Sequence, residues 1–86
     1  MIETTPNDLT SRVLARLAEI CGNDEVRTNL DLPIYARDIM DSMKTVEFIV
    51  ALEEELGVYV SPADLDREMW ATPRKIVADI ERRQRL

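Results

Sequence analysis

The chain has no histidine, one cysteine and only two glycines among its 86 residues. Without histidine it lacks the side chain that most often serves as a general base near neutral pH and most often binds metals. The single Cys21 excludes an internal disulfide and a cysteine-cluster metal site. Two glycines are too few for a glycine-rich phosphate loop. The usual parts of an enzyme are therefore missing, although paired carboxylates could still support an acid-based hydrolase.

Size and charge narrow the class further. A chain of 86 residues has room for one core, so we expect a single domain over residues 1–86. The net charge of −6 argues against nucleic acid and anionic membranes as partners and favours partners with basic docking faces. No secretory signal is visible, and no apolar run approaches the roughly 20 residues that span a bilayer. We expect a cytoplasmic monomer that does not insert into membranes.

Three segments have the spacing of amphipathic helices. The first is expected to begin near Thr5, where a hydroxyl, a proline and an acid follow N-terminal capping syntax, and to end at Gly22. The second covers residues 42–56, and the last opens at Thr72-Pro73. The residues predicted to face the core are Leu9, Val13, Leu14, Leu17, Ile20 and Cys21, then Met43, Val46, Ile49, Val50 and Leu52 or Leu56, and finally Ile76, Val77 and Ile80.

The segments between these helices are predicted to be irregular. Residues 23–41 lack a sustained period and form a long loop with room for a short helical turn. Loops of this length are often functional, and this one ends at Ser42, so we expect it to fix how that serine is displayed. Its predicted hydrophobic anchors are Val26, Leu30, Leu32, Ile34, Tyr35 and Ile39. Residues 58–60 have no partner strand and are predicted to be an extended linker, followed by a short helix that opens at Ser61-Pro62.

These elements predict an all-α fold, a small antiparallel bundle of three main helices plus one short helix. Cys21 is interpreted as a small core residue rather than a reactive thiol, because no local base or cation activates it. Trp70 is interpreted as a core anchor rather than a partner contact. Phe48 is expected to lie away from the centre of its helix's apolar stripe, against the third helix or the loop. The arginines near the C-terminus (Arg82, Arg83 and Arg85) suit the negative end of the last helix.

The most specific feature is the run Asp41-Ser42-Met43, where the loop gives way to the second helix. A hydroxyl there meets unpaired N–H groups and the positive end of the helix dipole, which favour a phosphate ester. Taken alone, an Asp-Ser pair is also a common helix cap. Nine acidic residues lie between Asp38 and Glu68, against two basic ones. This concentration favours a docking surface beside Ser42 over a merely solvated face.

These residues resemble the acyl and peptidyl carrier proteins, which bear 4′-phosphopantetheine on the serine of an Asp-Ser-Leu or Asp-Ser-Met motif. Ser42 matches that position. Over about residues 23–80, and most clearly in runs 41–47 and 66–76, the chain is similar to the D-alanyl carrier proteins of the teichoic acid D-alanylation pathway. Two departures stand out. The subgroup usually has a glycine three or four residues before the serine, but residues 36–39 contain none. We therefore expect Asp38 to adopt the left-handed conformation there. The second departure is Lys44, which stands where the subgroup often has glycine.

The resemblance implies a non-enzymatic carrier for cell wall biogenesis, with D-alanine held as a thioester on phosphopantetheine at Ser42. It implies a phosphopantetheinyl transferase, a D-alanine ligase and a downstream acyl transferase or acceptor system as partners. Asp41 would help to place the metal and cofactor during attachment, while the chain itself would hold no metal. The residues expected to form the docking face are Met43, Lys44, Val46 and Glu47.

Other functions remain open at this point. The closest is a free-standing carrier for fatty acid, polyketide or nonribosomal peptide synthesis, because the loading enzyme selects the cargo. A more distant one is a cofactor-free helical interaction module, in which Asp41 and Ser42 only cap a helix. The acid-based hydrolase is the least supported of the three.

Overall fold

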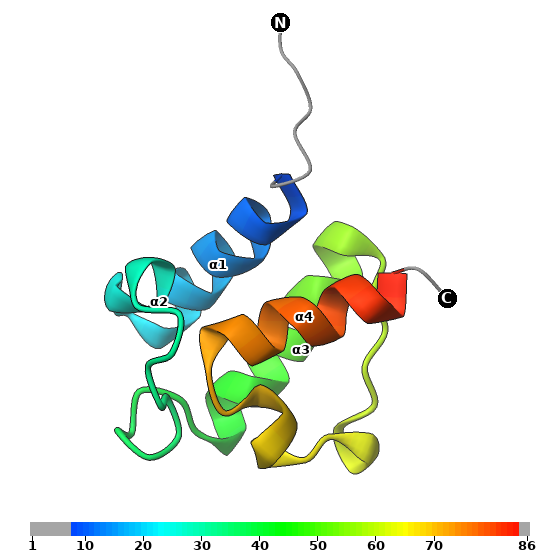
Figure 1. Ribbon diagram of the computed structural model, residues 1–86. Helices are drawn as coiled ribbons and strands as arrows, with labels where there is room; N and C mark the ends of the chain where they lie inside the picture. Colours follow the sequence, from blue (N-terminus) through cyan, green and yellow to red (C-terminus); the bar gives the residue numbers. More distant parts are fainter. Residues whose placement is uncertain (1–7, 85–86) are drawn as a thin grey trace, which may run out of the picture.

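The computed structural model describes residues 8–84, and every regular element in that range is helical. The long helices in that range are α1, α3 and α4, and α1 packs against both of the others (Figure 1). Their bounds are Asp8–Cys21 for α1, Ser42–Leu56 for α3 and Pro73–Gln84 for α4; the short elements are α2 (Glu25–Thr28) and two 3-10 turns, η1 (Pro62–Asp64) and η2 (Arg67–Trp70). The all-α prediction with three main helices is confirmed.

Helix α1 ends where the sequence predicted. Gly22 has a φ of 65°, the left-handed conformation that glycine adopts without a steric cost. The proposed start near Thr5 lies outside the described residues. Cys21 is buried, and burial raises the pKa of its thiol, with Lys44 opposing the shift and Asp41 adding to it. The thiol is therefore a core group, as predicted.

Helix α3 has the predicted bounds, and the predicted core residues Ile49 and Leu52 are buried, but the rest of its buried face differs from the prediction. Its buried residues are Thr45, Phe48, Ile49 and Leu52. Met43, Val46 and Val50, predicted to face the core, are 77%, 50% and 47% exposed. That prediction was wrong because α3 carries apolar residues at helical spacing on two faces, and periodicity alone does not say which face meets α1.

The aromatic pair Phe48 and Trp70 occupies the core between α3 and η2. Both side chains are fully buried, and their rings meet edge to face with centroids 5.5 Å apart. Phe48 is thus central to the buried face rather than off its centre, although it does pack against a later segment as expected. Trp70 also donates a hydrogen bond of 2.9 Å to Asp79 of α4. The core role predicted for Trp70 is confirmed.

The connection from α3 to α4 is extended and then tightly wound. Val58 and Val60 are buried while Tyr59 between them is exposed, which confirms the extended linker. The single short helix predicted next is replaced by η1 and η2. Asp66 starts η2 by accepting a hydrogen bond of 3.0 Å from the Glu68 backbone N–H. This cap at Asp66 was not predicted, and Arg67 follows it as the first residue of η2.

Candidate functional site

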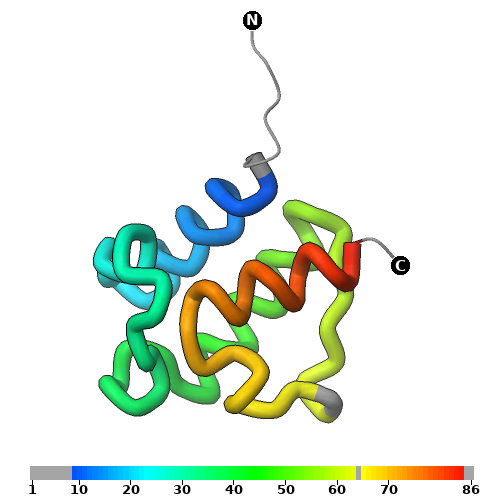
Figure 2. The backbone as a smooth tube through the Cα atoms, in the orientation of Figure 1, coloured from blue at the N-terminus to red at the C-terminus, as the bar shows by residue number. Residues whose placement is uncertain are grey.

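The loop between α2 and α3, residues 29–41, leads to the start of α3 (Figure 2). The carbonyl of Ile34 accepts hydrogen bonds from the backbone N–H groups of Ile39 and Met40, at 2.9 and 3.0 Å. The Ile34 N–H donates in turn to the Ala71 carbonyl at 3.1 Å, which ties the loop to the segment before α4. Asp38 has a φ of 59°, so the predicted left-handed residue is confirmed. The loop therefore holds the residues before Ser42 in a defined path.

Asp41 caps helix α3. Its Oδ1 accepts a hydrogen bond of 2.8 Å from the Lys44 N–H, while its carbonyl accepts from the N–H and the hydroxyl of Thr45, at 2.9 and 2.7 Å. A capping carboxylate at this position accepts a hydrogen bond from a backbone N–H that the helix leaves unpaired. Its negative charge also interacts favourably with the positive end of the helix dipole. The Ser42 hydroxyl is therefore not the group that starts the helix.

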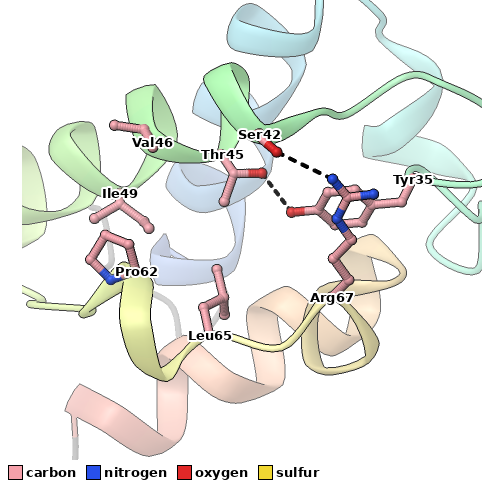
Figure 3. Close-up of a pocket in the computed structure, with 8 residues that line it drawn as sticks. All are labelled: Tyr35, Ser42, Thr45, Val46, Ile49, Pro62, Leu65 and Arg67. Atoms are coloured by element: carbon pink, nitrogen blue, oxygen red, sulfur yellow. Dashed lines mark hydrogen bonds between the residues drawn. The ribbon is translucent and has the colours of Figure 1, made fainter.

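Ser42 is exposed and faces a cation from a distant segment (Figure 3). Arg67 of η2 donates a hydrogen bond of 3.2 Å from Nη2 to the Ser42 Oγ. The guanidinium carbon of Arg67 lies 4.9 Å from the centroid of the Tyr35 ring, within the range of a cation–π contact. Arg67 and Tyr35 come from separate segments, and no local sequence signal marked either one as part of the site.

Thr45 completes this network from inside α3. Its Oγ1 lies 2.5 Å from the Tyr35 hydroxyl. Because the only hydroxyl proton of Thr45 goes to the Asp41 carbonyl, Tyr35 is the donor in that pair. The helix cap, the loop and η2 are thus joined around Ser42.

A shallow cleft of about 190 Å³ opens beside Ser42. Its polar end is formed by Ser42, Tyr35 and Arg67, and Figure 3 shows the apolar side chains farther along it. The complete lining is Tyr35, Ser42, Thr45, Val46, Ile49, Pro62, Leu65 and Arg67. Pockets that enclose small-molecule substrates commonly measure about 300–1,000 Å³, so this cleft suits one segment of a ligand rather than a buried substrate.

The predicted docking residues differ in exposure. Met43 and Val46, together with Val50, form an exposed apolar strip that we call the α3 stripe. Glu47 is also exposed. Lys44 is only half-buried, and its Nζ donates to the Ile39 carbonyl at 3.3 Å, so its amine is directed toward the loop. An apolar strip beside acidic side chains is therefore available on the outer face of α3.

Among the side chains that the structure describes, no group of cysteine and acidic residues is placed to hold a metal ion. No helix within residues 8–84 is both long enough and apolar enough to cross a membrane. At the polar end of the cleft, the exposed Ser42 hydroxyl lies beside the cation of Arg67.

Comparison with known proteins gives the class to which this site belongs. Residues 11–80 match the family described as the phosphopantetheine attachment site. The chain therefore belongs to the family of carrier proteins that bear covalent 4′-phosphopantetheine. The residues present fit that group, because an exposed serine hydroxyl at a helix N-terminus lies next to an arginine that can donate hydrogen bonds to a phosphate.

Individual relatives narrow the branch. The chain is 42% identical over 72 residues to the D-alanyl carrier protein of Lacticaseibacillus casei (strain BL23), over 84% of this chain and 89% of the relative. It is 38% identical over 74 residues to that of Enterococcus faecalis (strain ATCC 700802 / V583), over 86% and 95% of the two chains. The same identity and length hold for the protein of Bacillus cereus (strain B4264), over 86% and 94%. Within its family the chain is thus similar to D-alanyl carrier proteins.

Proposed function

We propose that residues 1–86 act as one carrier domain that holds D-alanine as a thioester on phosphopantetheine attached to Ser42. The observation that carries the proposal is the exposed Ser42 hydroxyl at the start of α3, left free of capping by Asp41. The D-alanyl carrier proteins that the chain resembles support the choice of cargo.

Each residue near Ser42 has a distinct part in this function. Ser42 Oγ forms the ester bond, and the bound group supplies a thiol on a long arm, so the protein needs no nucleophile of its own for the cargo. Asp41 uses Oδ1 for the cap, which leaves its second carboxylate oxygen to help place the metal and the cofactor while a transferase is docked. Catalysis belongs to the partners, in keeping with the absence of histidine.

The α3 stripe supports docking of those partners. Met43 and Val46 offer apolar area next to Ser42, and Glu47 and Lys44 add charges of both signs at its margin. We propose this surface for a phosphopantetheinyl transferase, a D-alanine ligase and a downstream acyl transferase or acceptor system in turn. Attachment of the arm uses coenzyme A and loading of D-alanine uses ATP, so we place both steps in the cytoplasm. We further propose that the protein acts as a monomer.

Mass spectrometry of the intact protein tests the attachment. The wild type is incubated with coenzyme A, Mg²⁺ and a broad-specificity phosphopantetheinyl transferase, with Ser42→Ala as the control. We expect one phosphopantetheine on the wild type and none on the variant. No gain with several transferases would reduce Ser42 to a residue at the start of a helix and favour the interaction module.

Loading of the holo protein then tests the cargo. D-alanine, L-alanine and a set of other acids are offered with ATP and a D-alanine ligase, and separately with ligases for other acids. We expect a gain of one alanine from the D-isomer. Refusal of D-alanine together with ready loading of another acid would assign the chain to a different carrier pathway.

A further inference from the structure

We propose that Arg67 binds the phosphodiester of the arm, so that the arm leaves Ser42 along the cleft rather than past Lys44. This inference rests on the attachment at Ser42 proposed above. It gives a role to a residue of η2 that lies 25 positions from the serine in sequence.

The contact between Arg67 and Ser42 is the first support. Arg67 Nη2 already donates to Ser42 Oγ, the atom that would carry the phosphorus. An ester oxygen remains an acceptor, and the new phosphate oxygens lie only two bonds beyond it, on the phosphorus. A guanidinium presents several N–H donors in one plane, a geometry suited to phosphate oxygens. Arg67 can therefore keep its place and gain charge-assisted hydrogen bonds.

The second support is that Arg67 is held in position before any phosphate is present. Its guanidinium lies against the Tyr35 ring, and the Tyr35 hydroxyl is bonded to Thr45 of α3. Neither of these contacts pairs the Arg67 guanidinium with a carboxylate, so both leave its charge available for an anion. A cation ordered in advance binds an anion with less loss of side-chain entropy.

Lys44 is the rival cation, two residues after Ser42. Its Nζ donates to the Ile39 carbonyl, on the loop before α3. Arg67, in contrast, lines the cleft together with Ser42, Val46, Ile49 and Leu65. A phosphate drawn to Arg67 directs the root of the arm toward these apolar side chains, and one drawn to Lys44 directs it away from them.

The test measures the mobility of the phosphate in the holo protein by ³¹P NMR. Wild type, Arg67→Gln, Arg67→Lys and a matched control, Arg27→Gln, are loaded to completion and checked by intact mass. Arg27 is an exposed residue of α2 outside the cleft, and its replacement removes the same charge. We expect the phosphodiester line to narrow in Arg67→Gln, to narrow less in Arg67→Lys, and to stay unchanged in Arg27→Gln.

Two further measurements sharpen the result. The Arg67 Nε–Hε signal is expected to shift when the wild type is converted from apo to holo. Salt should narrow the wild-type ³¹P line but not that of Arg67→Gln, because the Debye length falls from about 10 Å at 0.1 M to about 3 Å at 1 M. Tyr35→Leu, which removes the ring beneath the guanidinium, should narrow the line, whereas Tyr35→Phe should narrow it less.

An identical ³¹P line in wild type and Arg67→Gln would overturn the proposal. If Arg67→Gln resists loading, Tyr35→Leu decides, and an unchanged line in that variant would also overturn it. If the wild type gains no mass, attachment at Ser42 is refuted. If it gains mass but its ³¹P line width is the same as that of Arg67→Gln, only the role of Arg67 is refuted.

Discussion

Asp41 and Ser42 have separate roles in the structure, helix capping and presentation of a hydroxyl, which the sequence alone did not assign to one residue or the other. The carboxylate of Asp41 caps α3, and the Ser42 hydroxyl faces Arg67. The pair was predictable as a site because its signal lies within three consecutive residues. Arg67, Tyr35 and Thr45 were not, because they come from η2, the loop and the inside of α3, and only the folded chain brings them together.

Ser42→Ala should leave the fold nearly unchanged, with a free energy of unfolding within about 0.5 kcal/mol of the wild type, as for most surface substitutions. It removes the attachment atom but not the cap. Asp41→Ala, the companion variant, should lose about 1 kcal/mol as a lost cap does. Urea unfolding followed by far-UV circular dichroism measures both. A larger loss in Ser42→Ala than in Asp41→Ala would show that the serine is the structural cap.

Asp79 is the buried charge that the core depends on. Burial opposes its ionisation, but hydrogen bonds from Arg83, Trp70 and Arg82 outweigh burial and lower its pKa. Asp79→Ala should cost roughly 1–3 kcal/mol, because the Trp70 N–H is left buried without its acceptor. Asp79→Asn keeps an acceptor and should cost less. Equal stability of Asp79→Ala and wild type in urea would contradict this role.

The same carboxylate predicts a pH dependence. Because the folded pKa of Asp79 lies below its ordinary value of 3.8, its stabilising effect is complete above that pH. It is lost as the pH falls through the folded pKa. We therefore expect the stability difference between wild type and Asp79→Asn to shrink as the pH is lowered below 3.8. Urea unfolding series at several acidic pH values measure it, and a constant difference would contradict the assignment.

At the scale of elements, helix ends were more predictable than helix faces. Gly22 and Gly57 end α1 and α3 in left-handed conformations, and Thr72 caps α4 through a bond from the Lys75 N–H. Such signals are local. The buried face of α3 could not be predicted from such local signals, because α3 has an apolar strip on each of two sides. Contacts with α1 and η2 decide which of the two is buried.

The exposed α3 stripe should matter for docking and not for folding. Val46→Asp is expected to lower kcat/KM for attachment by the transferase about tenfold, equivalent to about 1.4 kcal/mol, with little change in unfolding. Tyr59→Asp is the matched control, since Tyr59 is an exposed large side chain outside α3. Equal losses in both variants would indicate a general effect of added charge rather than docking through α3.

Asp38 should reveal how much the left-handed turn before Ser42 contributes. At a φ of 59°, alanine is strained by about 1–2 kcal/mol relative to glycine, whereas aspartate is tolerated. Asp38→Ala should therefore be less stable than both Asp38→Gly and the wild type. Thermal unfolding of the three proteins gives the comparison. An alanine variant as stable as the glycine variant would mean that the loop relaxes to another path.

At the scale of the whole molecule, the net charge of −6 should speed encounters with basic partners. The association rate with the transferase is expected to fall steeply as salt is added, while the dissociation rate changes less. Stopped-flow mixing at several ionic strengths measures both rates. An association rate independent of salt would show that the acidic side chains only keep the chain solvated.

The burial of Trp70 gives this protein an intrinsic optical label. It is the only tryptophan in the chain, it meets Phe48 of α3 edge to face, and it bonds to Asp79 of α4. Its fluorescence emission therefore depends on how α3 and η2 pack against α4. No other tryptophan contributes to the signal. A partner or cargo that shifts α3 would change the colour or intensity of that emission in an unlabelled, unmodified protein.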